Sequence, residues 1–350
     1  MKSARTVTVK DVAKAAGVSQ AAVSMALRGS SEISAKRIEQ IQAVARKLNY
    51  YPQAAGQLLR SKRKNQIGLI VAATDTDAMT HSGFQAPLLG VLAEICYKQQ
   101  IAYQLELHHG DMASQSGLPH QIAANMVDGA ILIGDVGQDV YAALDQRPDF
   151  PWVSINEPAS YSVIMDIADV TKQLLEHIRS LGHSRVAYCG GPERYLEHRL
   201  ALETFEKLSQ QYGWSKHQSA DWIKLSDGVE DSARITEIYH WAHHLLESPK
   251  RPSAVICHGD PMARTVAHAA AQNGLVVGRD VSVTTWGSKF DAIKTWPIMT
   301  GVVYDHQQMA QAALTLLRQR MERPALVKPQ KQVVKASLHI GQSVGPCPKT

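Results

Sequence analysis

The sequence predicts two folds in one chain: an all-α head containing a helix-turn-helix, and an α/β body made of two doubly wound parallel-sheet subdomains. Three observations support this division. Residues 9–26 show two short helical patterns separated by a glycine turn. The first 64 residues hold thirteen Lys or Arg and three Asp or Glu, a net charge of +10. From residue 67 onward, short apolar runs alternate with stretches of helical periodicity.

The first helical pattern of the head has apolar residues on one face, with Ala13 placed where a second helix would cross it. Gly17 follows four residues later, where the chain must leave the helix in the left-handed conformation. Ser19 can cap the second helix by accepting from the backbone N–H of Val23 or its neighbour. This arrangement is typical of a helix-turn-helix DNA reader, although an ordinary helical hairpin shows the same spacing.

The charge distribution favours the DNA reader. The 286 residues after position 64 hold 24 basic and 29 acidic side chains, so a strongly basic head precedes a mildly acidic body. No apolar run approaches the ~20 residues of a membrane span, and the N-terminus has no apolar signal core. The four cysteines are scattered without a metal-binding spacing, as expected of reduced, buried thiols. We therefore expect a cytoplasmic protein with no metal and no cofactor.

The rest of the head ends in a linker. Asp11, three residues after Thr8, resembles a capping box for the first helix, and Ser34 is placed to cap a third helix. Residues 53–60 can form one or two helical turns, too few to be stable alone in water, and residues 61–66 are basic and polar. The expected domains are the head at 1–52, a hinge helix and linker at 53–66, and the body at 67–350.

The body alternates buried strands with helices, which indicates parallel sheets with right-handed crossovers. The expected strands are 67–73, 102–107, 129–134, 152–156, 185–190, 253–259 and 281–287. The expected helices are 87–99, 121–126, 170–181, 199–212, 232–246 and 262–273. Two sheets are needed for so many strands. The expected N-subdomain spans about 67–165 and 299–325, and the C-subdomain about 166–298 and 326–343. Ligands in such folds bind at the carboxyl ends of the strands.

From Val7 the head reads VTVKDVAKAAGVSQAAVSMAL, and from Val7 to Leu59 it resembles the lactose-repressor/galactose-repressor family of bacterial transcription regulators. The body resembles the family more loosely, through landmarks in family order: Val127-Asp128-Gly129, Leu181-Gly182-His183, Gly191-Pro192, Gly259-Asp260 and Asp280-Val281-Ser282. The resemblance implies a periplasmic-binding-protein-like body, a homodimer and a palindromic operator in double-stranded DNA. It favours a repressor that responds to a small-molecule effector, a sugar or related metabolite.

The resemblance also implies which head residues contact DNA. Gln20, Ala21 and Met25 take the base-reading positions: Gln20 can pair with adenine, and the other two offer apolar contacts, for instance to a thymine methyl. Leu59 matches the leucine that the family inserts into the minor groove. The residues placed for phosphate contacts are Thr8, Ser19, Ser24, Arg28, Ser34 and Arg37. For the serines, helix capping is the alternative role, and Ser19 and Ser34 can serve both.

The effector residues implied by the resemblance are Phe84, Asp166, Asp169, Arg194, Arg199, Asp260 and Trp286. Asp260 opens a helix after a strand and can equally be a helix cap, and Trp286 can be a core residue. Two positions depart from the sugar-binding members. Gly259 stands where they carry Asn, and Trp286-Gly287-Ser288 stands where they carry Asp after an aromatic residue. Two groups that commonly bind sugar hydroxyls are therefore missing.

Other functional classes fit less well. The glycine turns do not follow dinucleotide-binding or P-loop spacing, and no carboxylate dyad or nucleophile elbow accompanies the paired histidines at 108–109 and 243–244. We therefore expect no enzymatic activity, including that of a sugar-modifying enzyme fused to a DNA anchor. A periplasmic-type solute-binding receptor shares the body's fold, but it needs a secretion signal and has no use for a basic head. No leucine heptads follow the last strand, so we expect a dimer rather than a coiled-coil tetramer.

Overall fold

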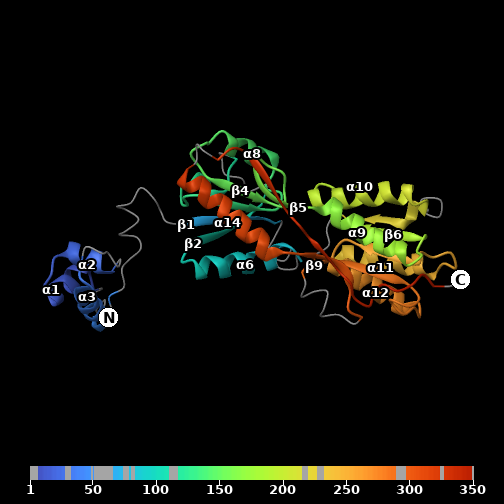
Figure 1. Cartoon of the computed structure of the whole chain (residues 1–350), viewed down its shortest axis with the longest axis horizontal. Helices are drawn as coiled ribbons and strands as arrows, with labels where there is room; N and C mark the ends of the chain where they lie inside the picture. The colour runs from blue at the N-terminus through green and yellow to red at the C-terminus, as the bar shows by residue number, and fades with distance from the viewer. Residues whose placement is uncertain are drawn as a thin grey trace. The chain divides into compact units, whose positions relative to one another are not determined.

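The computed structural model describes residues 7–27, 33–48, 50, 66–73, 79, 83–109, 117–214, 220–226, 232–288, 297–323 and 327–348. The chain forms two compact units, Met1–Lys64 and Asn65–Thr350, and the division falls inside the linker expected from the sequence (Figure 1). Within the described ranges, no helix is long and apolar enough to cross a membrane.

The head contains the expected helix-turn-helix and third helix. Its helices are α1 (Val9–Ala16), α2 (Gln20–Leu27) and α3 (Ala35–Lys47). Gly17 ends α1 in the left-handed conformation, with φ 64° and ψ 37°, and the Val18 N–H donates to the Ala13 carbonyl at 3.0 Å. The buried side chains come from all three helices and form one small core: Val12, Ala13, Val23, Ala26, Ile41 and Ala45.

The helix starts in the head differ in how they are capped. The Ala22 N–H donates to Ser19 Oγ at 3.1 Å, so Ser19 caps α2 as expected. The backbone N–H and the hydroxyl of Thr8 both donate to Asp11 Oδ2, at 2.8 and 2.7 Å. Ser34 occupies the cap position of α3, but its side chain makes no capping hydrogen bond.

The first sheet of the body, which we call the N-sheet, has the strand order β11-β5-β4-β3-β1-β2 and is parallel throughout. Its strands are β1 (Gln66–Ala72), β2 (Ala102–His108), β3 (Ala130–Ile133), β4 (Trp152–Ile155), β5 (Tyr161–Met165) and β11 (Gln330–Val334). Its helices are α6 (Gln85–Lys98), α7 (His120–Ala123), α8 (Gln138–Asp145) and α14 (His306–Glu322). Residues of α6 and α14 belong to one apolar cluster, and residues of α7 and α8 belong to another. The two helix pairs therefore cover opposite faces of the sheet.

The second sheet, the C-sheet, has the order β12-β10-β9-β8-β6-β7. Its strands are β6 (Val186–Gly190), β7 (Ile223–Leu225), β8 (Ala254–Cys257), β9 (Ser282–Ser288), β10 (Thr300–Tyr304) and β12 (Ser337–His339). Its helices are α9 (Ile167–Ser180), α10 (Leu196–Gln211), α11 (Ser232–Glu247) and α12 (Asp260–Gln272), and a short 3-10 turn, Ala220–Trp222, precedes β7. Among the described strands, β12 alone runs antiparallel to its neighbour, β10.

The crossovers between the sheets correct two of the expected subdomain boundaries. The chain passes from β5 to α9, from β10 to α14, and from β11 to β12 (Figure 1). The first crossover lies where it was expected, at 165–166. The assignments of 299–325 to the N-subdomain and 326–343 to the C-subdomain are wrong for two strands, because β10 pairs with β9 and β11 pairs with β5. Strand pairing decides the sheet, and no local pattern reveals the partner.

The two sheets share one strand order: β2-β1-β3-β4-β5-β11 in the first corresponds to β7-β6-β8-β9-β10-β12 in the second. In both, the chain winds to one side of the first strand and then returns to its other side. The order therefore reverses between β1 and β3 in the N-sheet, and between β6 and β8 in the C-sheet. Such reversals leave a crevice outside the carboxyl ends of the strands, where open α/β sheets bind ligands.

Candidate functional site

The outer face of α2 carries the base-reading residues expected from the sequence. Val23 and Ala26 are buried in the head core, whereas Gln20 and Ala21 are exposed and Met25 is half-buried one turn later. The spacing places the amide of Gln20 beside two apolar side chains on one helix face. This face can offer one bidentate hydrogen-bonding group and two methyl-type contacts to a DNA groove.

The residues expected at phosphates differ in what their hydroxyls already do. Ser19 Oγ accepts from the Ala22 N–H, so its own proton remains able to donate to a phosphate. The Thr8 hydroxyl is already used by Asp11. Ser34 and Arg37 are exposed at the start of α3, and Ser24 is half-buried on α2. Arg28 and Leu59, expected at a phosphate and in the minor groove, lie outside the described residues.

A second group of side chains lies at the reversal point of the C-sheet. His258 directly follows β8, and Gly191 directly follows the neighbouring strand β6. His198, in the first turn of α10, stacks on His258 with ring centroids 4.2 Å apart and a tilt of 40°. Trp286 of β9 also stacks on His258, with ring centroids 4.4 Å apart and an interplanar angle of 8°.

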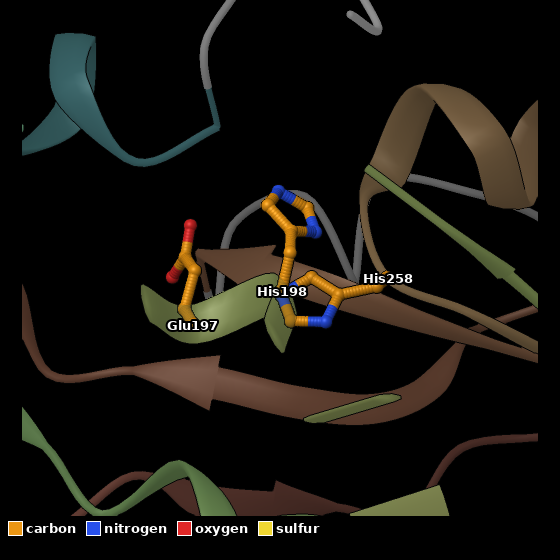
Figure 2. A group of neighbouring side chains, drawn as sticks. All are labelled: Glu197, His198 and His258. Carbon is orange, nitrogen blue, oxygen red and sulfur yellow. The ribbon is translucent and has the colours of Figure 1, made fainter. Parts of the chain in front are cut away.

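Gly191 holds the His198 ring in place. Its N–H donates to His198 Nδ1 at 3.1 Å, and a Cβ atom at Gly191 would lie 2.6 Å from His198 Cε1. Only glycine therefore allows this ring position. Because Nδ1 accepts, the neutral ring carries its proton on Nε2. Figure 2 shows the two imidazoles and the Glu197 carboxylate gathered in one region.

Burial keeps the two imidazoles neutral near pH 7. Together with a smaller contribution from the positive charge of Arg194, it lowers the pKa of His198 to about 4. Burial also holds the pKa of His258 well below its usual value, with a smaller contribution from His198. His258 Nε2 and Trp286 Nε1 are buried and have no hydrogen-bond partner among the described residues. Two buried polar atoms thus lack a hydrogen-bond partner, which lowers the stability of the fold unless a ligand supplies the missing partner.

Glu157 connects the N-sheet to this group of side chains. Glu157, just after β4, is 6% exposed, and its Oε1 accepts from the Leu196 N–H at the start of α10. Burial raises the pKa of Glu157 to about 8; the Leu196 hydrogen bond opposes this, and the charges of Asp135 and Glu197 add to it. The carboxyl ends of the two sheets therefore meet around the first turn of α10.

Glu197 lies between residues from both sheets. Its Oε2 accepts from the hydroxyl of Tyr304, the last residue of β10, at 3.3 Å. Burial raises the pKa of Glu197, and hydrogen bonds from Asn156 and Tyr304 oppose that shift. Asn156 has a φ of 69°, a left-handed backbone that L-residues other than Asn and Asp rarely adopt. The Glu197 carboxyl is thus held from two sides.

The expected effector residues divide into two sets. Phe84 and Trp286 are buried aromatic residues. Phe84 packs edge-to-face against Tyr304, with ring centroids 5.6 Å apart, and its ring centroid lies 5.7 Å from that of His306. Trp286 is 1% exposed, so it is a core residue that also stacks on His258. The core interpretation of Trp286 is therefore confirmed, and its role as an effector contact stays a prediction.

The remaining expected residues mostly serve helix ends and surfaces. Asp166 is the cap of α9, where its side chain accepts from the Asp169 N–H at 3.3 Å, and Asp169 is exposed. Asp260 is the first residue of α12 rather than its cap, a position that Gly259 takes. Its Oδ2 accepts from Arg264 Nε at 2.6 Å.

Of the two expected arginines, Arg194 lies on the loop before α10 and Arg199 lies in the first turn of α10. Arg194 is exposed, with its guanidinium 4.9 Å from the Tyr195 ring centroid. Arg199 is half-buried, and its Nη1 donates to the Glu193 carbonyl at 3.0 Å.

Sequence reasoning missed the residues at the centre of this site: Asn156, Glu157, Glu197, His198, His258 and Tyr304. One signal could have found four of them. Asn156 and Glu157 follow β4, His258 follows β8, and Tyr304 ends β10, all at carboxyl ends where α/β sheets bind ligands. His198 and Glu197 carry no such signal, because only the packing of α10 brings them to the strand ends.

Comparisons with known proteins agree with this architecture. Residues 8–53 match the family described as bacterial regulatory proteins, lacI family, and residues 175–344 match a periplasmic binding protein-like domain. The lactose operon repressor of Escherichia coli (strain K12) is 29% identical over 324 residues, covering 89% of this chain and 84% of that protein. The transcriptional repressor PurR of Serratia proteamaculans is 25% identical, covering 90% of each chain.

Solved structures show the same fold. A lac repressor dimer bound to operator and the anti-inducer ONPF superposes with a TM-score of 0.80 at 22% identity, covering 97% of this chain and 99% of that one. A complex of the transcriptional regulator CelR with cellobiose gives a TM-score of 0.66 at 20% identity, covering 96% and 99%. With its helix-turn-helix head and its two-sheet body, the chain resembles the lacI family of bacterial regulatory proteins in both of its parts.

Proposed function

We propose that this chain is a transcriptional repressor that binds a specific operator as a homodimer and is controlled by a small-molecule effector. One observation carries the proposal: a single chain joins a helix-turn-helix whose exposed face bears Gln20 and Ala21 to a two-sheet body with polar groups gathered at its strand ends. The first part reads DNA, and the second binds a ligand.

On DNA, α2 enters the major groove, where Gln20 pairs with a base, preferably adenine, and Ala21 and Met25 make apolar contacts. Phosphate contacts position this helix without specifying the sequence. Their donors are Thr8, Ser19, Ser24, Arg28, Ser34 and Arg37. For Thr8 this requires its hydroxyl to turn away from Asp11. Leu59 from each protomer wedges into the minor groove at the operator's centre.

The dimer forms through the edge of the N-sheet. The edge strand β2 exposes Tyr103 (41%) and Leu105 (49%), and the neighbouring helix α6 exposes Tyr97 (84%). Large apolar side chains grouped on an edge strand and the helix beside it are typical of a protein interface. A two-fold axis through this surface gives two heads that read the two halves of a palindrome.

The effector is a sugar or related metabolite bound where the two sheets meet. Phe84 and Trp286 are the proposed aromatic contacts, and the proposed polar contacts are Arg194, Arg199, Asp166, Asp169 and Asp260. Because Gly259 and the turn Trp286-Gly287-Ser288 lack two common sugar-binding side chains, other residues must bind the hydroxyls of the ligand. Glu197 and His198 offer an acceptor and an N–H donor at this point.

A protein that regulates transcription from bacterial DNA acts in the cytoplasm, and we expect no catalytic activity from this chain. The alternative function, a periplasmic-type solute-binding receptor, shares the body's fold. It does not account for the basic head of net charge +10 or for its exposed reading helix. A chain that binds sugars but shows no salt-dependent affinity for DNA would favour that alternative.

The operator is best found by selection from randomised DNA, followed by fluorescence anisotropy on selected and random duplexes. Gln20→Ala should weaken binding to the selected site by ~1–3 kcal/mol, relax the preference at one position per half-site, and leave binding to random DNA unchanged. Arg37→Ala is the matched control, because loss of a phosphate contact weakens binding to both duplexes alike. Equal losses of Gln20→Ala on both duplexes would place Gln20 on the DNA backbone instead.

A further inference from the structure

Three side chains of metal-ligand type meet at the reversal point of the C-sheet. Glu197, His198 and His258 each offer one ligand atom, and these atoms lie within 4.8 Å of one another. Glu197 and His198 come from the first turn of α10, and His258 from the end of β8, 60 residues later along the chain (Figure 2). Nothing in the family resemblance or in the sequence spacing predicts this cluster.

We propose that Glu197, His198 and His258 bind one divalent transition-metal ion of the zinc or nickel class. Imidazole nitrogen suits zinc, copper, iron and nickel, whereas Mg²⁺ and Ca²⁺ prefer oxygen ligands. Two imidazoles and one carboxylate are a ligand set found in catalytic zinc sites, where a further position stays open to water or another ligand.

The unsatisfied nitrogen of His258 is the independent observation that points to a ligand. His258 is 2% exposed, and its Nε2 has no hydrogen-bond partner among the described residues. Buried polar atoms are nearly always satisfied, so an unmatched one is a place where a bound species is missing. A metal ion would satisfy it, since a neutral imidazole nitrogen is the commonest protein ligand of such ions.

The surrounding contacts fit the outer sphere of a metal site. Ligating side chains are usually oriented by hydrogen bonds from their other atoms. Glu197 Oε2 accepts from the Tyr304 hydroxyl at 3.3 Å, and His258 Nδ1 lies 3.5 Å from the Tyr188 hydroxyl. Ring contacts of His258 with His198 and with Trp286 further limit the rotation of its ring. Glu157 adds a further, buried carboxyl near Glu197.

Ligation requires one local change. Zinc–ligand bonds of about 2.0–2.2 Å place ligand atoms on one ion about 3–3.5 Å apart, so the three side chains must close on the ion by side-chain rotation. His198 Nδ1 now accepts from the Gly191 N–H at 3.1 Å. Binding through Nε2 moves the ring proton to Nδ1, and binding through Nδ1 displaces the amide, so the Gly191 N–H loses this acceptor in either case. A change at the Gly191 amide therefore indicates that the ion has bound at His198.

The test uses the full-length, untagged chain, stripped with EDTA and then dialysed free of it. Isothermal titration with ZnCl₂ should show one ion per chain with micromolar or tighter affinity, and titration with MgCl₂ should show none. His198→Gln and His258→Gln should each weaken zinc binding by at least about 100-fold. His240→Gln is the matched control, because His240 lies exposed on α11, and its zinc affinity should equal that of the parent chain.

A second readout places the ion. In protein labelled with ¹⁵N-glycine, zinc should move the Gly191 amide signal, and His198→Gln should abolish that change. If His258→Gln fails to fold, Glu197→Gln takes its place in the titration. The proposal is overturned if the parent chain binds no zinc in the micromolar range, if the variants bind it as tightly as the parent, or if zinc binds without affecting Gly191. None of these outcomes bears on DNA recognition, so the proposed function is tested separately.

Discussion

Replacing Glu157 by Gln should make the body more stable at high pH. Glu157 is buried, and burial raises the pKa of its carboxyl from 4.5 to about 8. Between these values the unfolded chain loses the proton while the folded chain keeps it. The stability that the protonated Glu157 confers is therefore complete below pH ~4.5 and is lost as the pH rises through about 8. Gln cannot ionise, and its amide oxygen can still accept from the Leu196 N–H.

The magnitude follows from the shift. A change of about 3.5 pKa units at ~1.36 kcal/mol per unit sets an upper bound of ~5 kcal/mol, and relaxation of the site reduces it, so ~2–4 kcal/mol is expected. Glu157→Gln should accordingly show little gain at pH 5 and its full gain at pH 9. Thermal unfolding of the full-length chain in EDTA, followed at pH 5, 7 and 9, measures this difference.

The matched control is Glu203→Gln, on the exposed face of α10. It should track the parent chain at every pH. A gain for Glu157→Gln that is the same at pH 5 and pH 9, or a variant less stable than the parent at pH 9, would show that Glu157 is not the buried acid inferred from its surroundings.

Three further predictions concern other parts of the chain. Gly191→Ala places a Cβ 2.6 Å from His198 Cε1, so the ring must shift; calorimetry should show a loss of ~1–3 kcal/mol in stability, and unchanged stability would mean that the ring moves freely. Leu105→Asp on the exposed edge strand should convert the dimer to a monomer in analytical ultracentrifugation, and a persistent dimer would place the interface elsewhere. Leu59→Ala should weaken operator binding and reduce DNA bending while effector affinity stays constant, and an unchanged bend would exclude the minor-groove wedge.

Local sequence patterns were sufficient for the head. Gly17 adopts the left-handed turn, Ser19 caps the next helix, and Ala13 and Val23 enter the core as the periodicity predicts. Each of these features depends on residues within a few positions of one another, where backbone sterics and helical spacing act directly. The same reasoning found seven strands of the body, because a buried parallel strand is a continuous apolar run.

The order of those strands was decided only by tertiary packing. Thr300–Tyr304 is an apolar segment, but only its pairing with β9 assigns it to the C-sheet. The neighbouring helix α14 then packs on the other sheet. A strand's composition reflects burial on its two faces and carries no information about which chain segment supplies the neighbouring hydrogen bonds.

The candidate site in the body depended on tertiary structure most of all. Each ring in the stack is an ordinary histidine or tryptophan in sequence, and His198 and His258 are 60 positions apart. They meet because β6 and β8 are neighbours at the point where the strand order reverses, and because α10 folds back over their carboxyl ends. Burial then shifts their pKa values, and burial is a property of the packed molecule rather than of any residue type.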